Sequence, residues 1–257
     1  MTRPDDTATA PFDVREFART ARGSHRSEID GDAIAAAGLS PDAVHLIRVL
    51  RDLERGTLDR MRNLLVTATH KDARVTAFLA TWAFEKFWVA DALDAVLTAS
   101  GSPTEPLEGP LRHTASERAE RHGPIRRALA GNVAGADIVA SHVTTGLVDE
   151  RITQVAYRRL GDAAAVLSTL VHTLIEVKDR HVQFLAEEAE HKLSASARAV
   201  RITRKALAKA TWPIGAAAIP AADRTFFETF VFGDAEGRAA AARSPATSRA
   251  PTSSRRT

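Results

Sequence analysis

The sequence predicts an all-α protein, and three observations support this prediction. Ala is abundant, whereas the 257 residues include one Tyr and three Trp, a composition that favours helices over a sandwich or barrel. Four stretches, each about 25–30 residues long, repeat apolar side chains at helical spacing. Polar or Gly- and Pro-containing breaks separate these stretches. We therefore expect a four-helix bundle with a C-terminal helical extension.

The first long helix begins at a clear boundary. Ser40 is a good N-cap, and Pro41 and Asp42 suit the first helical turn, so we expect one helix to about residue 66. A break at T-A-T-H-K-D precedes a second helix over about residues 72–100. Residues 1–39, which are polar with glycine breaks, are expected to form a flexible lead-in with one short helix.

A long crossover is expected between the second and third helices. The linker G-S-P-T-E-P-L-E-G-P-L leads to a short polar helix at about 114–132. The third and fourth long helices then cover about 134–159 and 163–193. The bundle would thus occupy residues 40–195, and the crossover distinguishes it from a simple up-and-down bundle.

Two further segments follow the bundle. Residues 196–233 contain a basic helix and the apolar stretch D-R-T-F-F-E-T-F-V-F-G, whose Phe side chains we expect to pack on the bundle. An oligomer contact and a wall for a hydrophobic substrate are the alternatives. Residues 234–257 have the Arg-, Ser- and Pro-rich composition of a disordered tail.

Each long helix places an ionisable residue on its apolar side: Glu54, Glu85, Glu150, and Lys178 with His181. A bare carboxylate or ammonium in a core is unfavourable unless it is paired, hydrogen-bonded or metal-bound. Four helices that all do this near mid-length indicate a shared polar site. Carboxylate-bridged dimetal sites in four-helix bundles are built in this way.

Three motifs carry a resemblance to a known family. They are A-F-L-A-T-W-A-F-E-K-F-W (77–88), D-E-R-I-T-Q-V-A-Y-R-R-L (149–160) and I-E-V-K-D-R-H-V-Q-F-L (175–185). With Glu54, they resemble the ferritin-like di-iron carboxylate superfamily over about residues 45–190. The resemblance implies a ferritin-like four-helix bundle with the long crossover between helices 2 and 3.

Two departures from the family pattern affect the implied metal site. The second-helix histidine falls on Trp88 and the fourth-helix glutamate on Lys178, which leaves Glu54, Glu85, Glu150 and His181 as metal ligands. A lysine ammonium among three carboxylates neutralises them in part and repels a divalent cation. Two metals are therefore not expected. A single iron or manganese ion, and a metal-free polar core with Lys178 bonded to the glutamates, both remain open.

Individual residues also have alternative interpretations. Lys178, Tyr157 and Thr153 are candidate catalytic residues. The simpler interpretation of Tyr157 is a core side chain with one hydrogen bond. The simpler interpretation of Thr153 is a hydroxyl bonded to the helix backbone. Trp88 is expected to fill the volume of the missing histidine and metal. His181 is either a metal ligand or a core histidine bonded to Glu54 or Glu150.

Two functions remain open on these grounds. One is an oxidoreductase-derived enzyme that acts on a small hydrophobic organic substrate; the other is a non-catalytic, metal-free structural or partner-binding protein. A homodimer fits either function, whereas an iron store does not, because it needs two metals. The absence of Cys excludes disulfides and thiolate metal sites. Neither a signal peptide nor a membrane-spanning helix is expected, nor is nucleic-acid binding, so a cytoplasmic protein is the expectation.

Overall fold

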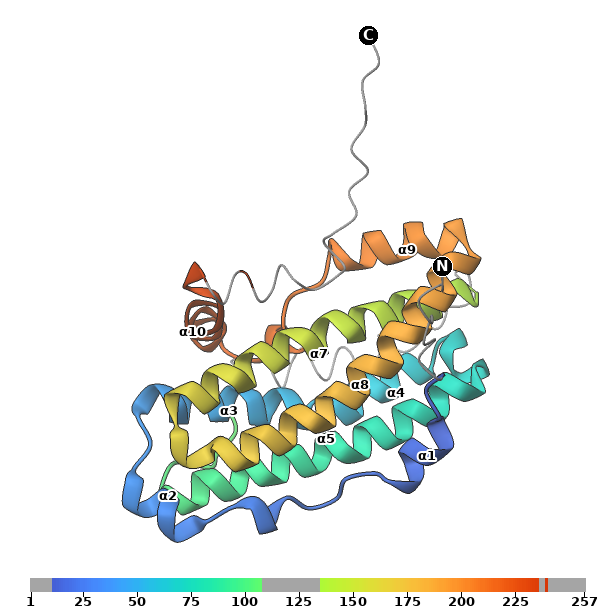
Figure 1. Ribbon diagram of the computed structural model, residues 1–257. Helices are drawn as coiled ribbons and strands as arrows, with labels where there is room; N and C mark the ends of the chain where they lie inside the picture. The colour runs from blue at the N-terminus through green and yellow to red at the C-terminus, as the bar shows by residue number, and fades with distance from the viewer. Residues whose placement is uncertain (1–10, 108–134, 236–238, 240–257) are drawn as a thin grey trace, which may run out of the picture.

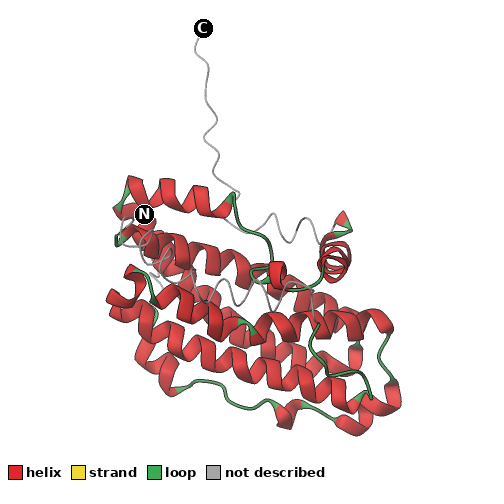
Figure 2. Ribbon diagram, turned by 180° about the vertical axis from the view of Figure 1, so that it is seen from behind, coloured by secondary structure: helices red, strands yellow, loops and turns green. Residues whose placement is uncertain are grey.

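The computed structural model describes residues 11–107, 135–235 and 239 (Figure 1). All regular elements in these residues are helices, and none of them is a strand (Figure 2). The predicted all-α class is thereby confirmed. The short helix expected at about 114–132 and nearly all of the expected tail lie outside the described residues.

The first predicted helix is correct at its start but not in its length. Helix α3 (Pro41–Arg55) begins where the Ser40 hydroxyl accepts a hydrogen bond from the Ala43 amide at 3.2 Å. The helix ends at Gly56, and α4 (Thr57–Leu65) follows as a separate helix. The expectation of one helix to about residue 66 is therefore wrong.

The other three long helices agree closely with their predicted ranges. Helix α5 (Ala73–Ala99) is capped by Asp72, whose carboxylate accepts from the Val75 amide. Helix α7 (Asp137–Ala163) is joined by the short 3-10 turn η3 (Ala165–Leu167) to α8 (Ser168–Ala195). This turn moves the start of α8 several residues beyond its predicted position.

The long helices lie side by side and enclose two apolar clusters (Figure 1). The first cluster includes Leu50, Leu93 and Leu174, and the second includes Phe78 and Phe184. On α5, α7 and α8, the residues of the two clusters are separated by a short stretch that carries charged side chains. The protein therefore has a charged layer between two apolar ones.

The N-terminal segment packs on the long helices. It contains α1 (Val14–Arg19), η1 (Arg26–Glu28) and α2 (Gly31–Ala37), and both α1 and α2 contact α5. Phe17 and Ile34 are buried in the two apolar clusters. Residues 11–39 thus hold more structure than the single short helix that the sequence predicts.

The C-terminal segment covers the outer side of α7. Helix α9 (Ala197–Leu207) packs along α7, and η4 (Ala216–Ala218) leads to α10 (Ala221–Phe232) (Figure 1). Phe227 and Val231 of α10 are fully buried against the first apolar cluster. The Phe226 ring stacks on His45 of α3 at 3.9 Å. The prediction that this apolar stretch packs on the long helices is confirmed.

Candidate functional site

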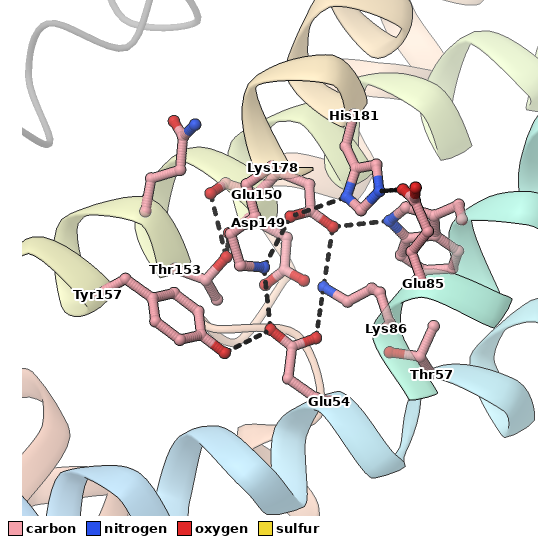
Figure 3. A network of polar contacts seen from close by, with 12 residues as sticks. Glu54, Thr57, Glu85, Lys86, Asp149, Glu150, Thr153, Tyr157, Lys178 and His181 are labelled. Carbon is pink, nitrogen blue, oxygen red and sulfur yellow. Dashed lines mark hydrogen bonds and ion pairs between the residues drawn. The ribbon is translucent and has the colours of Figure 1, made fainter. Parts of the chain in front are cut away.

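Four charged side chains meet in the layer between the apolar clusters, one from each long helical stretch. They are Glu54 of α3, Lys86 of α5, Glu150 of α7 and Lys178 of α8, and each is at most 2% exposed (Figure 3). Lys86 Nζ lies 2.7 Å from Glu54 Oε2 and 2.8 Å from Glu150 Oε1. Lys178 Nζ lies 2.9 Å from Glu54 Oε1 and 2.9 Å from Glu150 Oε2. Acid and base alternate around this ion-pair square.

Two aromatic residues complete the contacts of the square. The Tyr157 hydroxyl donates to Glu54 Oε1 at 3.1 Å, and the Trp82 indole donates to Glu150 Oε1 at 2.7 Å. Each carboxylate therefore faces two ammonium groups and one aromatic donor, and Glu150 also has the His181 ring 3.8 Å away. The two negative and two positive charges balance, which is the condition under which buried ions are tolerated.

The surrounding charges keep Glu54, Glu150 and Lys178 ionised. Burial alone would raise the pKa of Glu54, but the ammonium groups of Lys178 and Lys86 outweigh it and lower that pKa to about 2. The same lysines hold the pKa of Glu150 well below its usual range despite burial. Burial would lower the pKa of Lys178, yet Glu150 and Glu54 raise it above its ordinary value. Burial and the Glu54 charge raise the pKa of Tyr157, so the phenol stays neutral.

Glu85 and His181 form a close pair beside the square, and His181 also faces the Glu150 corner of the square (Figure 3). His181 Nε2 lies 2.7 Å from Glu85 Oε2, whereas its Nδ1 is 3.8 Å from Glu150 Oε2. Glu85 also accepts from the Arg22 amide at 2.7 Å and from the Arg180 guanidinium. The expected hydrogen bond from His181 to Glu54 or Glu150 is therefore replaced by one to Glu85.

The four predicted metal ligands thus fall into two groups. Glu85 and His181 bond each other, while Glu54 and Glu150 are linked through the two lysines. Within the part of the chain that the structure describes, no group of three or more acidic or His side chains is placed to hold a metal. A cation bound to Glu54 and Glu150 would have to displace two ammonium groups. The residues present therefore do not fit the iron or manganese ion that the resemblance implies.

The remaining predicted residues hold structural contacts. The Thr153 hydroxyl donates to the carbonyl oxygens of Asp149 and Glu150 in its own helix, both at 3.0 Å. Tyr157 makes the single hydrogen bond to Glu54 described above. Trp88 is half-buried beside Phe87, with a ring-centroid distance of 5.3 Å, and its indole N–H has no hydrogen-bond partner among the described residues. The expectation that Trp88 fills the volume of the missing histidine stays a prediction.

Lys86 is the residue that the sequence analysis missed. It follows the buried Trp82 by four positions and precedes the buried Val89 by three, which places it on the apolar side of α5. This helical spacing is the feature of the sequence that indicates an inward-facing Lys86. Its neighbour Glu85 is also buried, because α1 and α2 cover a further part of α5.

A pocket of about 350 Å³ lies between the α3–α4 break and α5. Its lining includes Glu54, Leu58, Phe87, Asp91 and Asp94. Asp91 pairs with Arg26, and Asp94 pairs with Arg51 and Arg55. The acids of this pocket are thus already neutralised by residues of the chain.

Comparisons with protein-family models, with curated proteins and with solved structures find no match to this chain. Among the described helices, none is both long and apolar enough to cross a membrane. The fold and the site define an all-helical protein with a buried, charge-balanced square of two glutamates and two lysines.

Proposed function

We propose that this chain is a metal-free, non-catalytic member of the ferritin-like superfamily, in which the ion-pair square takes the place of the metal centre. The observation that carries the proposal is the contact of both Glu54 and Glu150 with both Lys86 and Lys178 at 2.7–2.9 Å. Two fixed cations therefore supply the positive charge that metal ions supply in a dimetal carboxylate site.

The arrangement of the helices supports the ferritin-like part of the proposal. Helices α7 and α8 are joined by a short turn, whereas α5 and α7 are separated by the long connection from Ala99 to Asp137. The start of this connection is held against α3, because buried Arg51 donates to the carbonyl oxygens of Thr104 and Glu105. A single long crossover of this kind is typical of ferritin-like bundles.

The charge state of the square favours a structural role over an enzymatic one. A lysine that acts as a base or forms a Schiff base needs a depressed pKa, whereas the pKa of Lys178 is raised. Tyr157 is tied to Glu54 and is fully buried. Since each corner of the square comes from a different helix, the square sets the register of the four helices. Loss of one corner leaves an uncompensated buried charge, which disfavours any shifted packing.

Metal analysis tests this proposal. The full chain, expressed in medium supplemented with iron and manganese, is expected to contain substoichiometric amounts of both metals. Its melting temperature is expected to stay unchanged on addition of Mn²⁺ or Fe²⁺, because a ligand that binds the native state would raise it.

Two variants make the test specific. Glu150→Gln removes a carboxylate of the square, and Glu176→Gln removes an exposed carboxylate of the same helix pair as a matched control. About one metal ion per chain in the wild type, lost in Glu150→Gln and kept in Glu176→Gln, would contradict the proposal.

A further inference from the structure

Helix α9 exposes positive charge that the described part of the chain does not neutralise. Arg201, Arg204, Lys205 and Lys209, on and just beyond α9, are exposed. None of these four has an ion-pair partner among the described residues, in contrast to Arg51, which pairs with Asp52 and Asp94. In the sequence, residues 191–222 hold six Lys and Arg and no Asp or Glu. We call Arg201, Arg204, Lys205 and Lys209 the basic stripe.

The packing of α9 fixes the direction of the stripe. Ala199 and Thr203 are buried where α9 lies on α7, so the opposite side of the helix faces outward (Figure 1). At 1.5 Å per residue, the stripe extends over about 12 Å along one helix face. Trp212, just beyond the stripe, is half-buried, as are Ile202 and Leu207 on α9.

We propose that the basic stripe binds the anionic surface of a lipid membrane reversibly. An anionic leaflet attracts Lys and Arg residues that lie near its surface. Because the four cations lie on one helix face, all of them can approach a flat membrane surface at the same time. Trp is typical of the boundary between lipid and water. This peripheral contact needs no membrane-spanning helix, and it is independent of the proposed metal-free core.

Nucleic acid is the other polyanion that a basic stripe attracts, and the structure favours it less. Proteins that bind single strands combine a positive groove with aromatic side chains on which bases stack. The basic stripe lies on the outward side of a helix, and its positions hold no interleaved aromatic residue. Trp212 lies at one end of the stripe instead.

Vesicle sedimentation tests the proposal with the full chain. We expect the protein to sediment with phosphatidylcholine vesicles that contain roughly 30% phosphatidylserine, and not with pure phosphatidylcholine vesicles. Because the contact is electrostatic, binding should weaken as salt is raised. Replacing all four residues of the stripe by Gln should weaken binding more than about a hundredfold, since each charge contributes about fivefold.

A matched variant separates the stripe from the net charge. Arg15, Arg62, Lys71 and Arg158 are exposed cations elsewhere on the surface, and their joint replacement by Gln should leave vesicle binding as in the wild type. A third variant, Arg255→Gln with Arg256→Gln, removes two charges of the C-terminal sequence and should also retain binding. Equal melting temperatures would show that all variants are folded.

Several results would overturn the proposal. They are failure of the wild type to sediment with phosphatidylserine vesicles, equal losses in the stripe variant and the scattered-charge variant, and loss of binding on removal of Arg255 and Arg256. Tighter binding to duplex DNA than to the vesicles at the same salt concentration would assign the stripe to nucleic acid instead.

Discussion

At the scale of single residues, the centre of the protein depends on two lysines that play equivalent parts. Lys86 and Lys178 each join Glu54 to Glu150, and each also lies over an aromatic ring, Trp82 for Lys86 at 5.3 Å and Tyr157 for Lys178 at 5.2 Å. Such cation–π contacts add to the stabilisation of a desolvated ammonium. Removing either lysine leaves a net negative charge in the core.

We expect Lys178→Met to lower the free energy of unfolding by about 3–5 kcal/mol at neutral pH, the usual effect of breaking a buried ion pair on one side. Urea denaturation monitored by circular dichroism measures this loss. The exposed pair of Arg19 and Glu16 provides the control, and Arg19→Met should leave the midpoint unchanged within error.

The difference in the free energy of unfolding between the wild type and Lys178→Met should depend on pH. The pKa of Glu54 is lowered from 4.5 to about 2 in the folded state, so its pairing stabilises the protein above pH 4.5, and this stabilisation is lost as the pH falls towards 2. The difference between wild type and Lys178→Met should therefore shrink over that window. The raised pKa of Lys178 keeps its contribution intact up to at least pH 10.5. A difference that stayed constant from pH 7 to pH 3 would show that Lys178 is not paired with ionised carboxylates.

Sequence reasoning identified three corners of the square and missed the fourth. Glu54, Glu150 and Lys178 interrupt apolar stripes, so helical spacing alone indicated that they face inward. Lys86 lies on such a stripe too, but the family motif matches its neighbour Glu85 and so predicts Glu85 as the inward residue. Both are buried, because α5 is covered on more than one side, which periodicity along one helix does not reveal.

At the scale of elements, the break between α3 and α4 is held by a clamp that involves distant parts of the chain. Asp149 of α7 accepts from the Arg60 guanidinium at 2.8 Å and from the Ile214 amide at 2.6 Å. Arg60 in turn donates to the Thr57 hydroxyl, beside Gly56, at 2.9 Å. The clamp therefore joins the α3–α4 break, α7 and the segment that follows α9.

We expect Asp149→Ala to lower the free energy of unfolding by about 2–4 kcal/mol, because it leaves a largely buried guanidinium and a backbone N–H without their partner. Hydrogen exchange at the Ile214 amide should become faster than in the wild type. Asp59→Ala, which removes an exposed partner of Arg62, is the control and should change neither quantity. Unchanged protection of Ile214 in Asp149→Ala would show that the clamp does not hold this segment.

Helix boundaries were predictable where local chemistry sets them. The caps at Ser40 and Asp72 use a side chain and an amide within three residues, so their signals lie in the sequence itself. The break at Gly56 was not predicted, since apolar spacing continues through it and the contacts that stabilise it come from Arg60 and Asp149. The packing of α1 and α2 likewise rests on contacts with distant helices.

At the scale of the whole molecule, the two apolar clusters supply the buried apolar surface that stabilises the fold. The charged layer between them favours one packing of the helices over others. Apolar side chains tolerate several packings of similar energy, whereas a misplaced charge in the core is strongly unfavourable. The order of helices and their apolar sides were visible in the sequence. The charge balance of the square was not visible in the sequence, because Lys86 was not among the predicted residues.

The most direct test of the metal-free core is NMR of the lysine side-chain nitrogens in the full chain at neutral pH, recorded before and after one equivalent of Mn²⁺. Signals that are lost in Lys86→Met and in Lys178→Met identify the two buried groups. We predict two protected ammonium signals that stay sharp after Mn²⁺ is added, since each ammonium lies within 2.9 Å of both carboxylates. Signals that vanish by paramagnetic broadening at one equivalent, or that report neutral amines, would contradict the account.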